Sequence, residues 1–180
     1  MNRAMLGGMP LPNRRPYVVG FFGTASMLLG VLALSASGGQ SHYLAFGAST
    51  CAGGLVLAWL GFTGHRAGWV AWAVTAALGT AGLFLSLLVV RETVCCMFGY
   101  HRGMGYPWGW LDSGASAETM EQIEALRANP WRLEKTVDWP KVVLDGLFWW
   151  HIAVAATLPL SQTLSLLAEW RSRREERMAS

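Results

Sequence analysis

Four side chains in this 180-residue sequence have the chemistry for a ligand or metal site: one histidine in an apolar stretch, and two cysteines and a histidine in a loop. His151 lies well inside the last apolar segment, roughly 13 Å from its start at the rise of an α-helix. There it can ligate haem, contact a quinone beside Trp149 and Trp150, or hydrogen-bond between helices. A bis-histidine haem needs a second imidazole at this depth. His42 and His65 lie at opposite ends of the second apolar segment, so this chain alone does not supply one. We therefore expect hydrogen bonding and no cofactor, with cofactor contact as the alternative.

Cys95, Cys96 and His101 form the second candidate, a metal site. Thiolates and imidazoles bind zinc, but this spacing matches no standard zinc pattern. Adjacent cysteines rarely form a disulfide with each other because the ring is strained, and Cys51 lies deep in an apolar segment. The sequence has no C-x-x-C motif, so it does not support a thiol oxidoreductase. We expect thiols near the lipid surface or bonded to another subunit, and no metal.

The elements that must position these residues are long apolar segments. Between Tyr17 and Val90 the only charged side chain is Arg66. Each segment approaches the ~20 residues that a helix needs to cross the hydrocarbon core, and barrel-like alternation is lacking. The helices are expected at about 17–35, 43–63, 69–90 and 142–168. We predict an all-α membrane protein, a four-transmembrane-helix bundle that forms a single integral membrane domain over residues 1–180.

Residues 91–141 lie between the third and fourth segments and carry too many charges to sit in lipid. A short helix is expected at about 117–127, where acidic residues favour the first turn. Before it, glycines and a proline alternate with Tyr106, Trp108 and Trp110. We interpret this segment as a structured extracytoplasmic loop that caps the bundle. It is either purely structural or uses these three rings as a docking surface.

Small residues recur at helical spacing in the first three segments. Membrane helices gain little from burying apolar surface, so small residues mark where their backbones approach. The glycines are Gly23 and Gly30 in the first segment, Gly47, Gly54 and Gly61 in the second, and Gly79 and Gly82 in the third. We expect these stripes to pack against the polar stripe of the fourth segment. The alternative is that one of them docks a partner's helix.

The arginines predict the orientation. The short segments that flank the four helices on one side hold Arg3, Arg14, Arg15, Arg66, Arg171, Arg173, Arg174 and Arg177. Basic residues in the long loop are balanced by acidic ones. Because short arginine-rich segments stay in the cytoplasm, we predict a multi-pass protein of the plasma (inner) membrane with both termini cytoplasmic.

This layout resembles that of the tetraspanins, which also have a large loop between the third and fourth spans, cytoplasmic termini and an adjacent cysteine pair. The resemblance covers the layout alone. Met97 follows the pair where the tetraspanin motif has glycine, the loop is much shorter, and its other cysteines are missing. It therefore implies no function.

No nucleotide-binding, hydrolase or kinase motif occurs, and no basic run with interleaved aromatics indicates nucleic acid. We expect a non-catalytic accessory or interaction subunit of a larger membrane complex. Its partners would be the lipid bilayer and other membrane subunits or a second copy. Two alternatives stay open: a small quinone- or haem-linked redox protein using His151, and an oligomeric transporter or channel. The nearly charge-free spans argue against transport.

Overall fold

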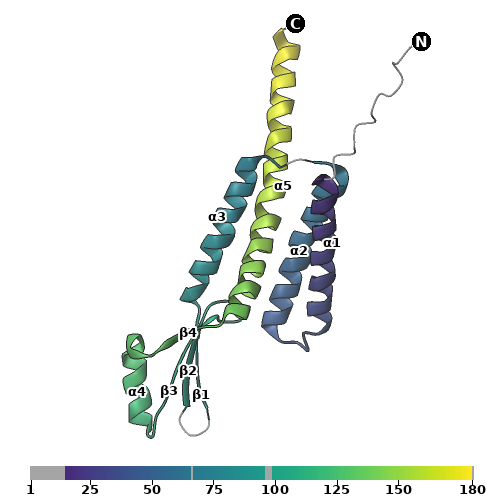
Figure 1. Ribbon diagram of the computed structural model, residues 1–180. Helices are drawn as coiled ribbons and strands as arrows, with labels where there is room; N and C mark the ends of the chain where they lie inside the picture. Colours follow the sequence, from purple (N-terminus) through teal and green to yellow (C-terminus); the bar gives the residue numbers. More distant parts are fainter. Residues whose placement is uncertain (1–14, 66, 96–98, 180) are drawn as a thin grey trace, which may run out of the picture.

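Long helices dominate the computed structural model, which describes residues 15–65, 67–95 and 99–179 (Figure 1). Four of them are long and apolar enough to cross a membrane, so they indicate a multi-pass membrane protein. They are α1 (Arg15–Ser35), α2 (Ser41–Thr63), α3 (Trp69–Leu85) and α5 (Trp139–Ala179). The prediction of four apolar helices is confirmed.

Glycines in left-handed conformations make the turns beside α2. Gly38 and Gly39 have φ angles of 52° and 83° and connect α1 to α2. Gly64 has φ 71° and ends α2, the usual role of glycine just after a helix. A side chain is strained in this region, whereas glycine is not. These positions let α2 run back along α1 (Figure 1).

The four apolar helices form an open row in the order α1, α2, α5, α3. In this row α1 packs on α2, α2 on α5, and α5 on α3 (Figure 1). The two helices at the ends of the row are therefore less covered than α2. Within the most apolar stretches, 17% of α1 and 22% of α3 is buried, against 50% of α2. The expectation that three glycine stripes meet at the fourth helix is wrong for α1 and α2, because Gly23 and Gly30 of α1 face Gly54 and Gly47 of α2.

The chain forms a small sheet after α3 and before α5, which the all-α prediction missed. Its antiparallel strands, in spatial order, are β1 (Val90–Cys95), β2 (Gly99–Met104), β3 (Leu111–Ser116) and β4 (Lys135–Val137). Glycine and charged residues are poor strand formers, and β2 and β3 contain both. Antiparallel pairing within the sheet overrides these weak preferences.

One face of this sheet is covered by α4 (Met120–Ala128) and by the segment after it, which includes the 3-10 helix η3 (Pro130–Arg132). Tyr100 and Ile123 are fully buried between them. Helix α4 starts later than the predicted 117–127 because the side chain of Thr119 caps it, accepting a hydrogen bond from the backbone N–H of Gln122.

Helices α3 and α5 differ from the predictions at their ends. The α-helical part of α3 ends at Leu85 and is followed by the 3-10 turn η1 (Ser86–Leu88). Strand β1 starts almost directly after this turn. Helix α5 was predicted at 142–168 but begins at Trp139 and continues to Ala179. Its last turns project past the ends of the other helices (Figure 1).

Candidate functional site

The β2–β3 loop, residues 105–110, is hydrogen-bonded to α5. We call this contact the sheet joint. Asp145 Oδ1 accepts a hydrogen bond from the backbone N–H of Trp108 at 3.1 Å. Trp149 donates its indole N–H to the backbone carbonyl of Tyr106, with 3.0 Å between Nε1 and O. Asp145 and Trp149 are four residues apart and therefore share one face of α5.

Lys141 continues the same face of α5 toward the sheet. Its Nζ lies 2.9 Å from Asp112 Oδ2 in β3 and 3.0 Å from Asp138 Oδ2. Hydrogen bonds from the Lys141 side chain and backbone hold the pKa of Asp138 below its ordinary value. One face of α5 thus fixes both β3 and the β2–β3 loop.

Asp145 is the most unusual polar residue of the sheet joint, because it is fully buried. Its Oδ2 has no hydrogen-bond partner within the part of the chain that the structure describes. Burying such a group is costly, so Asp145 is a candidate functional residue. Sequence reasoning did not single it out, because a carboxylate one turn inside a span is ordinarily assigned to the membrane interface. The feature of the sequence that could have indicated Asp145 is that an acidic residue stands in an otherwise apolar segment.

The ring of Trp108 packs against the first turns of α2. Its centroid lies 4.9 Å from that of Phe46 and 5.9 Å from those of His42 and Tyr43. These are ordinary edge-to-face aromatic separations. The β2–β3 loop is therefore held between α2 and α5, two central helices of the row.

The other two rings of the predicted docking surface also pack within the chain. Tyr106 lies 5.6 Å from Phe148 of α5, and the Arg91 guanidinium lies 5.7 Å from the Tyr106 ring. Trp110 is only 9% exposed. Tyr106 and Trp108 thus contact helices of the same chain and Trp110 is buried, which leaves little ring surface for docking a partner.

His151 is buried where α5 meets α2. Its Nδ1 lies 2.7 Å from the Leu147 carbonyl oxygen in the same helix; a carbonyl only accepts, so Nδ1 carries the proton. A Cβ on Gly53 of α2 would lie 2.7 Å from the His151 carbonyl oxygen. The described hydrogen bond of His151 is thus within α5, and its contact with α2 is steric.

The remaining residues of the cofactor hypothesis have separate contacts. Trp149 belongs to the sheet joint, and Trp150 stacks on Trp72 of α3 at 6.3 Å. His42 contacts Trp108 at one end of α2, whereas His65 stacks on Trp59 near the other end. The described contacts therefore do not bring His42 or His65 to His151.

The metal hypothesis concerns the hairpin of β1 and β2. Cys95 and His101 are both exposed; Cys95 pairs with Gly99, and His101 pairs with Thr93. Cys96 lies outside the described residues. Over the described ranges, no group of three or more His, Cys, Asp or Glu side chains is arranged to hold a metal ion.

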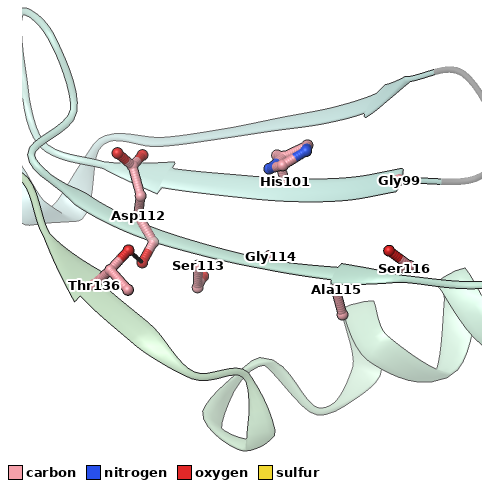
Figure 2. A pocket seen from close by; sticks show the side chains of 8 residues that line it. All are labelled: Gly99, His101, Asp112, Ser113, Gly114, Ala115, Ser116 and Thr136. Atoms are coloured by element: carbon pink, nitrogen blue, oxygen red, sulfur yellow. Dashed lines mark hydrogen bonds between the residues drawn. The ribbon is translucent and has the colours of Figure 1, made fainter.

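A shallow hollow of about 540 Å³ lies on the sheet (Figure 2). It is lined by Gly99, His101, Asp112, Ser113, Gly114, Ala115, Ser116 and Thr136. His101 pairs with Gly114 and Asp112 pairs with Gly103, so the imidazole and the carboxylate occupy different register positions. Figure 2 shows them well separated along the strands. Because Asp112 already binds Lys141, this arrangement is no general acid–base pair.

The predicted packing glycines of α1 and α2 lie against each other's helix. A Cβ on Gly23 would overlap the backbone N of Ala58, and a Cβ on Gly54 would lie 2.7 Å from the carbonyl oxygen of Gly23. A Cβ on Gly30 would lie 2.8 Å from the carbonyl oxygen of Gly47. Gly61 is also buried. Side chains at these contacts would push the two backbones apart.

The two glycines of α3 lie against α5 instead. A Cβ on Gly82 would lie 2.5 Å from the Trp149 ring, whereas one on Gly79 would lie 3.4 Å from Trp150 Cα. Thr75 Oγ1 lies 2.6 Å from Thr157 Oγ1 and adds a hydrogen bond between the helices. The α3–α5 contact therefore combines rings, hydroxyls and small residues.

No family model matches the chain, and no curated protein and no solved structure matches it. The class that the four apolar helices indicate is a multi-pass membrane protein, and the chain also carries a small antiparallel sheet. Any more specific function must be argued from the contacts described above.

Proposed function

We propose that this protein is a non-catalytic accessory subunit of a larger membrane complex, held in the bilayer by its four apolar helices. The observation that carries the proposal is the outer face of α3. On that side α3 exposes Ala73, Ala77 and Thr80, four and three residues apart and thus on one helix face. Small residues let a second helix approach closely, whereas lipid contact does not require them.

The sheet joint supports the same proposal. Hydrogen bonds and an ion pair attach the sheet to α5, and the Trp108 ring attaches it to α2. A sheet fixed in this way is a firm extramembrane platform rather than a loose loop. A subunit that positions other proteins needs such rigidity.

Photo-crosslinking in intact cells tests the proposal. A photoreactive amino acid at Ala77 should give an adduct whose mass increases by that of a protein, either another subunit or a second copy. The matched control is Leu28 of α1, which is 62% exposed on a bulky face and should react with lipid. If both positions react only with lipid, α3 has no protein partner and the proposal is wrong.

The proposed orientation places both termini in the cytoplasm and the sheet outside. The start of α1 and the end of α5 lie on the same side of the row (Figure 1), and the last turns of α5 are rich in arginine. In a background without native cysteines, an impermeant thiol reagent added outside cells should label Glu118→Cys but not Met178→Cys. Both positions are exposed, so labelling reports the side of the membrane rather than burial. Labelling of Met178→Cys from outside would reverse the orientation.

One observation favours the alternative of a haem- or quinone-linked redox protein. With its proton on Nδ1 and bound to the Leu147 carbonyl, neutral His151 has its ligand lone pair on Nε2. Many metal-binding histidines are oriented by such a backbone hydrogen bond. Protein purified from native membranes would then show a visible absorption band that His151→Gln abolishes. A transporter would instead need several copies, because the open row does not surround a path.

A further inference from the structure

The last turns of α5 project beyond the rest of the protein. Leu158 is fully buried against α2, but every residue from 163 to 178 is exposed. Figure 1 shows this part of α5 extending past the ends of α1, α2 and α3. An isolated helix of this length is marginal in water, so a surface that covers it would stabilise it.

Basic side chains gather on one face of these turns, where Glu169 Oε2 also lies 3.6 Å from the guanidinium of Arg173. Trp170, Arg173, Arg174 and Arg177 follow the i, i+3, i+4, i+7 spacing of one helix face and line a common hollow of about 620 Å³. We call them the tail face. The guanidinium of Arg174 lies 5.3 Å from the centre of the Trp170 ring, a cation–π separation. Glu175 lies on the far side of the helix from this face, and Glu176 lies beside it, three residues after Arg173.

The position of the tail face along α5 matches the depth of lipid headgroups. From Trp139 to Trp170 the helix rises roughly 46 Å at 1.5 Å per residue. A bilayer with its headgroup layers is roughly 40–45 Å thick. Both indoles are largely exposed, as at a membrane interface. If Trp139 lies in one headgroup layer, Trp170 reaches the opposite one.

The apolar residues before Trp170 fit the same arrangement. Leu164, Leu166 and Leu167 are 58%, 60% and 57% exposed. In water this cluster would be unfavourable, whereas beside acyl chains it is not. The order along the helix is therefore leucine, tryptophan and then arginine, which follows the change from acyl chain to headgroup.

We propose that the tail face binds the phosphate groups of anionic phospholipids in the leaflet where α5 ends. Guanidinium groups form paired hydrogen bonds with phosphate oxygens, and their charge favours an anionic leaflet. The three arginines stand within two helical turns, so several headgroups can bind at once. This proposal rests on the proposed membrane insertion, but not on the orientation or on any protein partner.

The test uses the full-length chain in vesicles of phosphatidylcholine with or without phosphatidylglycerol in both leaflets. In a background without native cysteines, an environment-sensitive dye on Met178→Cys reports the polarity around the last turn. The dye emission should shift to the blue in the anionic vesicles only, and salt should reverse this shift. Each arginine near an anionic surface adds roughly fivefold to association, so R173Q/R174Q/R177Q should remove the shift.

A charge-matched variant distinguishes the tail face from net charge. R173E/R174E/E175R/E176R keeps the composition but moves positive charge away from the tail face, so it should reduce the shift strongly. Equal emission of the unmodified tail in both lipids would overturn the proposal, as would a full shift in either variant. A response that appears only after a cytosolic protein fraction is added would assign the face to a protein partner and also overturn it. Unchanged crosslinking at Ala77 would show that the proposed function stands independently.

Discussion

The two helix pairs at the ends of the row use the same residue type in different ways. In α1 and α2, glycines on each helix lie against backbone atoms of the other, as Gly23 and Gly54 show. In α3 and α5, glycines of α3 lie against tryptophan side chains or at ordinary contact distance. Backbone atoms of a helix cannot move aside without moving the helix, whereas a ring can rotate. A glycine at helical spacing therefore marks a contact between helices, but it does not show whether that contact tolerates a larger side chain.

The largest effect is expected at the α1–α2 contact. Gly54→Leu places a side chain where the Gly23 carbonyl oxygen and the Met27 backbone N would each lie 2.7 Å from its Cβ. We expect a loss of about 3 kcal/mol or more, at the upper end of overpacking effects, because the helices must separate. Thermal unfolding in detergent measures it. The control is Leu55→Ala at a 58% exposed position of the same helix, and equal losses would show that the α1–α2 contact is not rigid.

The sheet joint adds a polar contact to the comparison. Asp145→Leu leaves the Trp108 N–H without its acceptor inside the protein, which should cost about 1–3 kcal/mol. Asp145→Asn keeps a carbonyl oxygen as acceptor and should cost less. Protease sensitivity of the sheet, read alongside the melting of the helices, locates the loss. If Asn and Leu destabilise equally, the Trp108 hydrogen bond is not what holds the joint.

The α3–α5 contact should tolerate small additions unequally. Gly82→Ala requires the Trp149 ring to shift, and that ring is also held by the Tyr106 carbonyl. We expect a loss of about 1 kcal/mol, the low end for overpacking. Gly79→Ala meets only ordinary contact and should be neutral or gain up to about 1 kcal/mol from helix propensity. The same melting assay compares them, and a larger loss at Gly79 would contradict this packing.

His151 should contribute little to stability for a buried polar residue, because its hydrogen bond lies within α5. His151→Leu should cost less than about 0.6 kcal/mol, the average for hydrogen bonds between membrane helices. His151→Gln should cost no more, since an amide also donates. Unfolding of the purified variants measures both. A chromophore that both variants lose without any change in melting would instead establish the redox alternative.

The sequence was informative where composition alone determines structure. Long charge-free segments identify the four helices, and glycine spacing identifies the faces that pack closely. Neither determines which helix meets which, because the stripe with Gly54 would fit several small-residue partners. The row order therefore emerges only from the folded chain.

The sheet and its joint depend on contacts between distant residues. Tyr100 and Met104 lie on one face of β2, but Arg102 lies between them on that face, so the period-two signal is weak. Asp145 is buried at a point where the backbone N–H of Trp108, 37 residues earlier, donates a hydrogen bond to it. No local pattern encodes that meeting. The sequence left a docking role and a structural role open for Trp108 and its neighbours for the same reason, since an aromatic run looks alike whether it faces a partner or its own chain.

The smallest effect is expected from the ion pair of Asp138 and Lys141 at the edge of the sheet joint. The stability of this polar contact should depend on pH, whereas that of a steric contact should not. The pKa of Asp138 is lowered in the folded state by hydrogen bonds from Lys141. Its stabilising contribution is thus complete above the unfolded pKa, near 3.9, and is lost as the pH falls through the lower folded value. Between about pH 5 and pH 3 the melting temperature should fall slightly more for the unmodified protein than for Asp138→Asn. The cost of Gly54→Leu should be the same throughout this range, because no charge takes part in that contact. If Asp138→Asn shows the same pH profile as the unmodified protein, the Asp138–Lys141 pair contributes nothing to folding, and the joint relies on the Lys141–Asp112 pair, Asp145 and the aromatic rings.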